Sequence, residues 1–344
     1  MHRRAFLAAL LAAAGCSRSS KRVVVYCAQD REFAEGLFAS FKDETGLAAV
    51  PRFDTEANKS VGLFRDIVAE KGQARCDVFW NNEILSTLRL RKEGLLAAHA
   101  SPSAEEYPAE CRAPDHTWHA FAARARVFIV NTALIAEDDC PRGLAGLGSA
   151  KIAGRFVMAR PQFGTTATQT ACLFDVLGEE AAKAMMLGWK ANGLQLAPGN
   201  KQVAEWVARG KTPLGKPAAL GLTDTDDALA EVRAGKPVAV LLPDHQAEGR
   251  MGTLFIPNTL SIPEGCPNPE GARKLVDFLL SAESEKALAE GPGKQVPLNP
   301  KVKAKLPAPL DDLEDVKTME VNWDKAADLW DAAQEFVTRE FALA

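Results

Sequence analysis

The stretch AFAARARVFIVN, residues 120–131, decides the fold. Its apolar run predicts one long strand, on which Arg124 and Arg126 alternate with alanines and share a face. A second long strand is predicted over GTLFIPNTLSI, residues 252–262. A chain that leaves one lobe, builds another and returns makes a two-strand hinge, so we expect a ligand cleft between two lobes.

Short apolar strands alternate with helical patterns on both sides of these two stretches. Examples are VVVYCA, followed by a helix that stops at Gly46, and CDVFW at residues 76–80. This alternation predicts an α/β protein with two lobes, each a mostly parallel sheet flanked by helices. We expect lobe 1 to comprise residues 22–125 plus 256–300, and lobe 2 residues 126–255 plus 301–344 with amphipathic C-terminal helices.

The first sixteen residues, MHRRAFLAALLAAAGC, have the pattern of an export signal. Two arginines precede an apolar run that is too short to span a bilayer. The cysteine after Ala-Ala-Gly is similar to a lipoprotein box, so residues 1–16 are predicted to end in a lipidated Cys16. The start also resembles a twin-arginine signal. We therefore expect a lipid-anchored protein of the periplasm or cell surface.

Composition excludes several classes of partner. The chain has 344 residues, 47% of them hydrophobic, and a net charge of −4 without a basic run, which argues against nucleic acid. The motifs G-x-S-x-G and H-E-x-x-H and a Gly-rich phosphate loop are absent, so an exported enzyme is a remote alternative and no catalytic cofactor is expected.

Seven cysteines accompany the export signal, which makes disulfides plausible. Cys111 and Cys140 lie in Pro-rich loops and are the best candidate pair. The pattern of pairing among the six cysteines after Cys16 stays open.

Several phrases in order resemble one family. They are VVVYCAQDREF, DVFWNNEIL, ARARVFIVNT, RPQFGTTATQ, LGLTDTDDAL and GCPNPEGARKLVDFLLS with QVPLNP. The chain resembles type 2 periplasmic solute-binding proteins of ABC importers, in particular the ferric-ion-binding group. The resemblance implies capture of a small ligand by a monomer, delivery to an ABC permease and its ATPase, and no catalysis.

The resemblance also shows where the binding site departs from the group. The position of the iron-binding histidine falls on Asp30, and that of the carboxylate on Asn82, with Glu83 next to it. The position of the consecutive tyrosine pair falls on Asp226 and Asp227. The only two tyrosines are elsewhere in the sequence, so the phenolate site for ferric ion is absent.

An acidic cluster follows a predicted buried strand and opens a helix, in Thr223-Asp224-Thr225-Asp226-Asp227. One of these residues would serve as a helix cap, but three carboxylates exceed what a cap needs. Like charges this close raise each other's pKa and repel unless a cation neutralises them. Carboxylate and hydroxyl oxygens suit a hard cation, for which Asp30, Asp226 and Asp227 are the candidate metal ligands.

A second group of candidates suits an anion. Gly164, Thr165 and Thr166 precede a helix, and free backbone N–H groups at a helix start attract negative charge. Arg124 would pair with an anion or with the aspartates. Two hypotheses stay open: a bound metal ion, iron-type or another hard cation with or without an anion, and an organic or oxyanionic solute. The alternative role is helix capping for the aspartates, the threonines and Asn82, and an interlobe ion pair for Arg124.

Overall fold

The computed structural model describes residues 21–54, 61–245 and 251–342. The predicted signal, residues 1–16, and Cys16 lie outside the described residues. The strands are β1 (Arg22–Cys27), β2 (Ala48–Phe53), β3 (Val78–Asn81), β4 (Leu96–Ala97), β5 (Trp118–Asn131), β6 (Phe156–Ala159), β7 (Gln195–Ala197), β8 (Leu220–Asp224), β9 (Val238–Leu241) and β10 (Phe255–Pro263).

The α-helices flank these strands. They are α1 (Arg31–Thr45), α2 (Val61–Ala69), α3 (Leu85–Lys92), α4 (Gly164–Leu177), α5 (Glu179–Ala191), α6 (Asn200–Arg209), α7 (Thr225–Arg233), α8 (Pro269–Leu279), α9 (Ala282–Glu290), α10 (Trp323–Asp328) and α11 (Trp330–Phe341). Short 3₁₀ helices are interspersed in the loops, for example at Pro102–Glu106 and Ala109–Cys111.

The sheet is mixed, in the order β2-β1-β3-β10-β5-β8-β6-β7, with β4 on β10 and β9 on β5. The outer strands pair in parallel, β1 with β2 and β3, and β6 with β7 and β8. The central strands β5 and β10 pair antiparallel with each other and with their neighbours. The expectation of mostly parallel sheets therefore holds for the outer strands and not for the centre.

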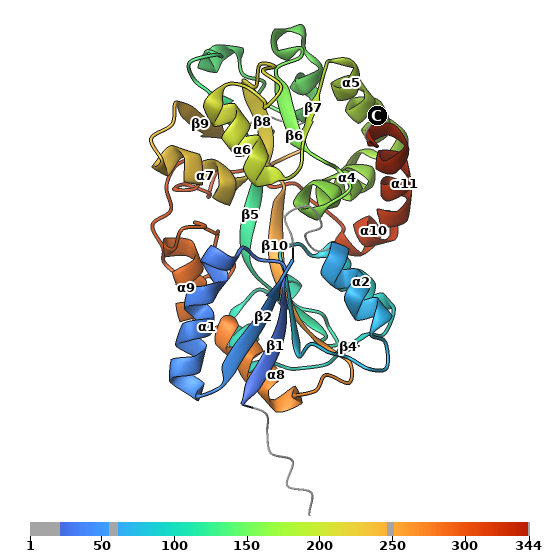
Figure 1. Ribbon diagram of the computed structural model, residues 1–344, viewed down its shortest axis with the longest axis vertical. Coiled ribbons are helices and arrows are strands. Elements are labelled where there is room, and N and C mark those ends of the chain that lie inside the picture. The colour runs from blue at the N-terminus through green and yellow to red at the C-terminus, as the bar shows by residue number, and fades with distance from the viewer. Residues whose placement is uncertain (1–20, 55–60, 246–250, 343–344) are drawn as a thin grey trace, which may run out of the picture.

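Two α/β halves meet where β5 and β10 cross from one to the other (Figure 1). β5 pairs with β10 through Trp118–Ala125 and with β8 through Arg126–Val130, so one strand belongs to both halves. The register of β10 shifts between Pro257 and Asn258, and the opposing Ala122 adopts φ +41°. A bulge of this kind bends a strand locally. The crossing lies where the sequence predicts the hinge.

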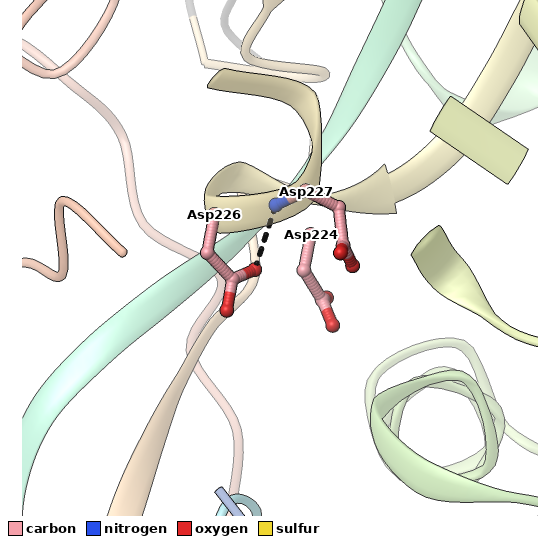
Figure 2. Close-up of side chains that lie close together, drawn as sticks. All are labelled: Asp224, Asp226 and Asp227. Atoms are coloured by element: carbon pink, nitrogen blue, oxygen red, sulfur yellow. Dashed lines mark hydrogen bonds between the residues drawn. The ribbon is translucent and has the colours of Figure 1, made fainter. Parts of the chain in front are cut away.

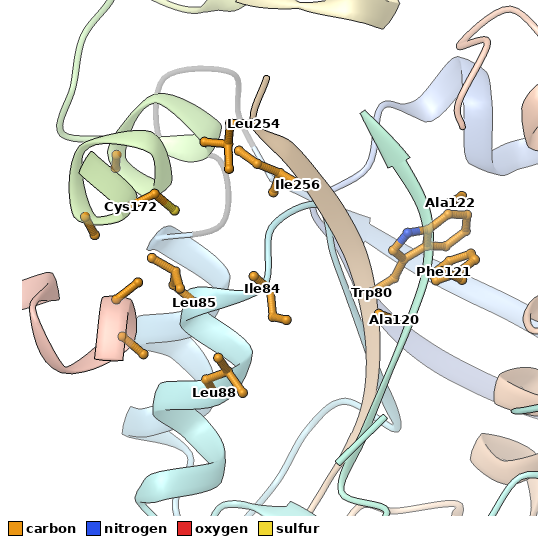
Figure 3. Close-up of a cluster of buried hydrophobic side chains, with 14 of the residues drawn as sticks. Trp80, Ile84, Leu85, Leu88, Ala120, Phe121, Ala122, Cys172, Leu254 and Ile256 are labelled. Atoms are coloured by element: carbon orange, nitrogen blue, oxygen red, sulfur yellow. The ribbon is translucent and has the colours of Figure 1, made fainter. Parts of the chain in front are cut away.

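The hydrophobic core is continuous across that crossing. One cluster of buried side chains joins Trp80 and Leu85 of the first half to Cys172 on α4 and to Leu254 and Ile256 (Figure 3). Trp80 is fully buried and packs against Phe38 and Phe121 with ring centroids 5.8 and 5.4 Å apart. It is therefore a core residue.

The C-terminal helices connect the halves a second time. α10 packs against both α3 and α4, and α11 packs against α4. Lys325 pairs with Asp175 of α4 at 2.9 Å, while Lys92 of α3 pairs with Asp328 at 2.5 Å. We expected these helices with the second lobe alone, whereas α10 contacts both halves.

The structure does not support the predicted disulfide. Cys111 and Cys140 are buried free thiols, as are the other four cysteines of the described chain. Cys111 adjoins Arg112, which bridges to His119 at one end of β5, and Cys140 follows Asn131 at the other end. About twelve strand positions, roughly 40 Å of extended chain, separate these two ends of β5, so the loops that carry the two cysteines start far apart.

Across the described residues, no helix combines the length and apolar character needed to cross a bilayer.

Candidate functional site

A fully buried arginine pairs with the first aspartate of the acidic cluster. Arg126 projects from β5, and its Nη1 lies 2.7 Å from Oδ1 of Asp224 at the end of β8. Nη1 also donates to Asn200 at 3.0 Å, and Nε donates to Gln169 at 2.9 Å. The guanidinium also donates to the hydroxyls of Thr165 and Thr166, each at 3.3 Å. Both threonines belong to the loop that the sequence predicts to bind an anion. The guanidinium is thus surrounded by acceptors from helices α4 and α6 and from the end of strand β8.

Arg124 lies two residues earlier on the same face of β5 and is bonded differently. Its Nη1 lies 3.1 Å from Oδ2 of Asp226, and Nη2 donates to Gln29 at 3.0 Å and to Asn258 at 3.4 Å. Its Nε has no hydrogen-bond partner within the described part of the chain. Burial lowers the pKa of Arg124, but the negative charges around it, led by Asp226, outweigh that effect and raise the pKa above its ordinary value.

The acidic cluster forms as the sequence predicts. Asp224 ends β8 and precedes α7, with Asp226 and Asp227 in the first turn of that helix (Figure 2). One carboxylate oxygen from each lies within 4.8 Å of the other two. The backbone N–H of Asp227 donates to Asp226 at 3.1 Å, so one carboxylate also satisfies a helix donor. The cluster combines a capping role with a grouping that could hold a cation.

The predicted repulsion between these carboxylates is offset. Asp224 pairs with Arg126 and accepts hydrogen bonds from Thr165 at 2.6 Å and Asn200 at 3.0 Å. Asp226 pairs with Arg124. The start of α7 adds partial positive charge. Our expectation of repulsion in the ligand-free site did not take into account these two guanidinium groups, which pair with Asp224 and Asp226.

A small pocket opens beside the cluster. Its volume is about 20 Å³, room for about one water molecule. Asn82, from the end of β3, reaches it from the first half, and the other walls come from β5 and the second half. The lining residues are Asn82, Arg124, Ala159, Arg160, Phe163, Gly164, Thr165, Pro198, Gly199, Asn200, Asp224 and Asp227.

Three helices begin at this pocket. α4 starts at Gly164, α6 at Asn200 and α7 at Thr225. Gly164 has φ +55°, a conformation that favours glycine, so the chain turns sharply before α4. Each helix start presents N–H groups and about half a positive charge, so the pocket is favourable for negative groups, including the three aspartates themselves.

Other predicted residues have mainly structural contacts. The Glu83 carboxylate accepts from the backbone N–H of Leu85 at 2.6 Å and of Ser86 at 3.0 Å, and from the Thr168 hydroxyl of α4 at 3.0 Å. It caps α3 and joins the halves. The Thr225 hydroxyl accepts from the backbone N–H of Ala125 at 3.2 Å.

Asp30 lies before α1, and the charge of its carboxylate contributes to the raised pKa of Arg124. It therefore acts on the same guanidinium from the first half, although it does not line the pocket among the described residues.

The two phenols are far from phenolate character. The Tyr26 hydroxyl donates to Glu70 at 2.7 Å, and burial followed by that contact raises the pKa of Tyr26 to about 12. Burial also raises the pKa of Tyr107, with Glu285 nearby. Neither lines the pocket, so its ligand groups are carboxylates, hydroxyls, amides and guanidinium groups.

The structure adds residues that the sequence did not single out for the site. Asn200 bonds to Asp224, Thr165 and Arg126, and Arg160 lines the pocket directly after β6. Gln29 and Asn258 hold Arg124. The sequence holds two signals for these residues, since Gln29 follows the predicted strand VVVYCA and Asn200 opens the amphipathic stretch NKQVAEWVAR.

Comparison with known proteins places this architecture in a class. The model of the family described as bacterial extracellular solute-binding protein matches residues 85–328. This covers more than half of the chain, which therefore belongs to that family. It is a binding protein and not an enzyme, and the family implies an extracytoplasmic location, a small ligand and an ABC transporter as partner.

Individual proteins are similar at lower identity. The major ferric iron-binding protein of Neisseria meningitidis is 26% identical over 302 residues, which is 87% of each chain. Iron-bound HitA from Pseudomonas aeruginosa shares the fold with a TM-score of 0.79 at 22% identity, covering 92% of this chain and 99% of that one. AfuA from Actinobacillus pleuropneumoniae, solved with fructose-6-phosphate, gives a TM-score of 0.80 at 22% identity, covering 94% and 99%.

Proposed function

We propose that this chain is a lipid-anchored solute-binding protein of an ABC importer that captures a hard metal ion, iron-type or similar, between its two lobes. The lobes are those expected from the sequence, residues 22–125 plus 256–300 and residues 126–255 plus 301–344. Similarity to ferric iron-binding proteins supports iron as the first candidate. The bound ion would be cargo for the permease and its ATPase, carried by a monomer.

The observation that carries this proposal is the convergence of Asp224, Asp226 and Asp227 within 4.8 Å beside a pocket of about 20 Å³. Oxygen ligands favour hard cations. The volume suits an ion with at most a small companion in this conformation, and a larger solute would require the halves to separate.

Charge argues for an ion that arrives with its own anion. Two of the three carboxylates already pair with Arg124 and Arg126. The site therefore has little net negative charge. A bare trivalent ion bound there would leave an excess of buried positive charge, which is energetically costly. An accompanying anion would lower that excess and would find the starts of α4 and α6 beside it.

A ligand screen tests the proposal. Protein purified without chelator is analysed by native mass spectrometry, then by thermal shift with Ca²⁺, Mg²⁺, Mn²⁺, and Fe³⁺ supplied with citrate or phosphate. One metal should stabilise the protein, by about 2.7 kcal/mol at a hundredfold excess over its Kd. Asp227→Asn should remove that response, whereas Asp138→Asn, an exposed aspartate outside the pocket, should keep it.

The spectrum of bound iron gives a second check. Tyr26 and Tyr107 are the only phenols and neither lines the pocket. Loading with ferric citrate should therefore give no intense visible tyrosinate band. A purple-red protein would show that the metal lies elsewhere.

An oxyanionic or organic solute is the second candidate. It is favoured by the Nε of buried Arg124, which has no partner in the described chain, and by Arg160 on the pocket wall. AfuA, of similar fold, was solved with a sugar phosphate. Stabilisation by phosphate or a sugar phosphate without metal, lost in Arg160→Met, would favour this candidate over the metal.

The anchor has its own test. Cys16→Ser should release the protein from the membrane fraction or block its processing. Identical fractionation of wild type and variant would remove the lipid anchor from the proposal and leave the solute-binding function standing.

A further inference from the structure

Two buried cysteines, Cys76 and Cys266, lie at one corner of the first half. Cys76 comes two residues before β3, and Cys266 lies in the loop between β10 and α8. On one side of that loop, Ser261 of β10 pairs with Phe79 of β3. The two strands are antiparallel, so the chain that leaves β10 runs back beside the chain that enters β3. The loop therefore begins next to the segment that carries Cys76.

The other side of the loop is held by the carboxylate that follows Cys76. Asp77 accepts from the backbone N–H of Asn268 at 2.6 Å. Burial raises the pKa of the Cys266 thiol to about 11, and the same N–H of Asn268 acts on that thiol in the opposite direction. The backbone N–H of Cys266 donates to the carbonyl of Pro263 at 3.2 Å, which closes a turn. The loop is thus fixed on both sides of Cys266 against residues 77–79.

The two thiols lie close enough for one to act electrostatically on the other. Burial is the main cause that raises the pKa of the Cys76 thiol, and a charge on Cys266 is a further cause. Cys76 also lines a cavity of about 300 Å³ together with Gly265, the residue before Cys266. Cys172 on α4 differs. Burial raises its pKa as well, but the charges that add to this rise belong to carboxylates and not to another thiol.

We infer that Cys76 and Cys266 become joined by a disulfide in the exported protein, which ties the entry of β3 to the loop before α8. Both are free thiols in the structure, the reduced form from which the bond is made. A disulfide needs Cα atoms about 4.4–6.8 Å apart, which is the spacing of neighbouring chains in a sheet. The inference rests on the extracytoplasmic location of the family and not on the identity of the ligand.

The oxidation takes two protons and two electrons from the pair of cysteines. Each thiol loses its S–H bond, and one S–S bond forms between them. The oxidant is itself a disulfide, either oxidised glutathione or a thiol oxidoreductase, and it is reduced to two thiols.

Burial implies that the bond forms while the chain folds. The thiolate is the reactive form, and with a pKa of about 11 Cys266 stays a thiol at neutral pH in the folded protein. In the unfolded chain both groups are exposed and have ordinary thiol pKa values of about 8.5. The bond would enclose residues 76–266, which include β5 through β10, so it would restrict the unfolded chain and stabilise the folded one.

Refolding tests the inference without export and without ligand. Protein unfolded in reductant is refolded in a mixture of reduced and oxidised glutathione, its remaining thiols are alkylated, and its peptides are mapped without reductant. We expect a peptide that joins Cys76 to Cys266, and the same peptide in protein recovered after export. Free thiols at both positions in either sample, or a bond from either cysteine to another one, would overturn the inference. The linked peptide in a protein that responds to no metal would keep the disulfide and reject the proposed cargo.

Sensitivity to reductant gives a second readout. Wild type refolded with reductant should melt roughly 5–10 °C below wild type refolded in the glutathione mixture. Cys76→Ala combined with Cys266→Ala should show no such difference, since both samples lack the bond. Cys172→Ala should keep the full difference, although its melting temperature falls because a buried side chain is truncated. A full difference in the double variant would overturn the inference, because the sensitivity would then belong to other cysteines.

Discussion

Two buried arginines lie on one face of β5, but the residues that surround their guanidinium groups differ. Around Arg126, acceptors from α4, α6 and β8 enclose the guanidinium within the second half. Around Arg124, the acceptors come from both halves, and the side chain lines the pocket. Equal burial therefore does not imply equal roles, since the first ion pair belongs to the interior of one half and the second to the place where the halves meet.

The largest loss of stability should come from breaking the Arg126–Asp224 ion pair inside the second half. Arg126→Met leaves the buried Asp224 carboxylate without its cation, and removal of one partner of a buried pair typically costs about 3–5 kcal/mol. Urea unfolding measures this loss. Adding Asp224→Asn to the variant should recover part of it, because the uncompensated charge disappears. Stability within error of wild type would show that the pair is not buried in solution.

A third buried base on β5 extends the comparison. Among the described residues, no carboxylate is hydrogen-bonded to the His119 ring, and its Nε2 lies 2.8 Å from the carbonyl oxygen of His99. Burial lowers the pKa of His119 from 6.5 to about 4. Between pH 6.5 and pH 4 the His119 ring is therefore protonated in the unfolded chain and neutral in the folded protein. The free energy of unfolding should consequently fall as the pH drops through this range.

The size of that loss is about 3 kcal/mol across the window, from 1.36 kcal/mol per pKa unit. His119→Gln keeps a polar group opposite the carbonyl and does not titrate. The difference in unfolding free energy between wild type and this variant should therefore shrink with falling pH. A constant difference from pH 7 to pH 4 would mean that His119 has the same pKa in the folded protein as in the unfolded chain.

The fold could be predicted because its signal is local. Apolar runs such as residues 120–131 mark buried strands, and the helix that begins at Arg31 ends at Gly46 in the left-handed conformation, as the sequence indicates. Helix α9 was missed because its sequence, AESEKALAE, is mostly polar and buries a glutamate, Glu285, at the crossing. That glutamate accepts from the backbone of Ala122, a contact that no local pattern encodes.

The site could be predicted only in part. The acidic cluster is contiguous in sequence, so its convergence followed from one helix start. Pairing of Arg124 with the aspartates was one alternative that the sequence offered. The contacts of Arg126 with Gln169 and Asn200 were not predicted, because these residues come from separate elements and meet only after folding.

The Arg124–Asp226 pair, where the two halves meet, should contribute less to stability than the Arg126–Asp224 pair inside the second half. Asp226→Asn retains an acceptor for Arg124 and leaves other carboxylates to act on it, so the expected loss is about 2 kcal/mol, the scale of a hydrogen bond to a charged group. Urea unfolding of the ligand-free protein checks it. A gain in stability would restore the original expectation that like-charge repulsion dominates the cluster.

The smallest effect should come from an ion pair that is exposed to solvent on the surface of α6. Arg209 on α6 lies 3.3 Å from Glu205, with its side chain 62% exposed. Solvent screens such a pair and the flexible side chain loses entropy when it forms, so exposed i,i+4 pairs contribute about 0.3–0.5 kcal/mol. Arg209→Met keeps much of the apolar stem while it removes the charge. It should therefore shift the unfolding midpoint in urea hardly at all and leave any metal response intact. Because α6 also carries Asn200 at the pocket, a large loss here would mean that the whole helix is marginally stable. In that case the effect of Arg126→Met could not be assigned to the buried pair, since any weakening of α6 would disturb Asp224 as well.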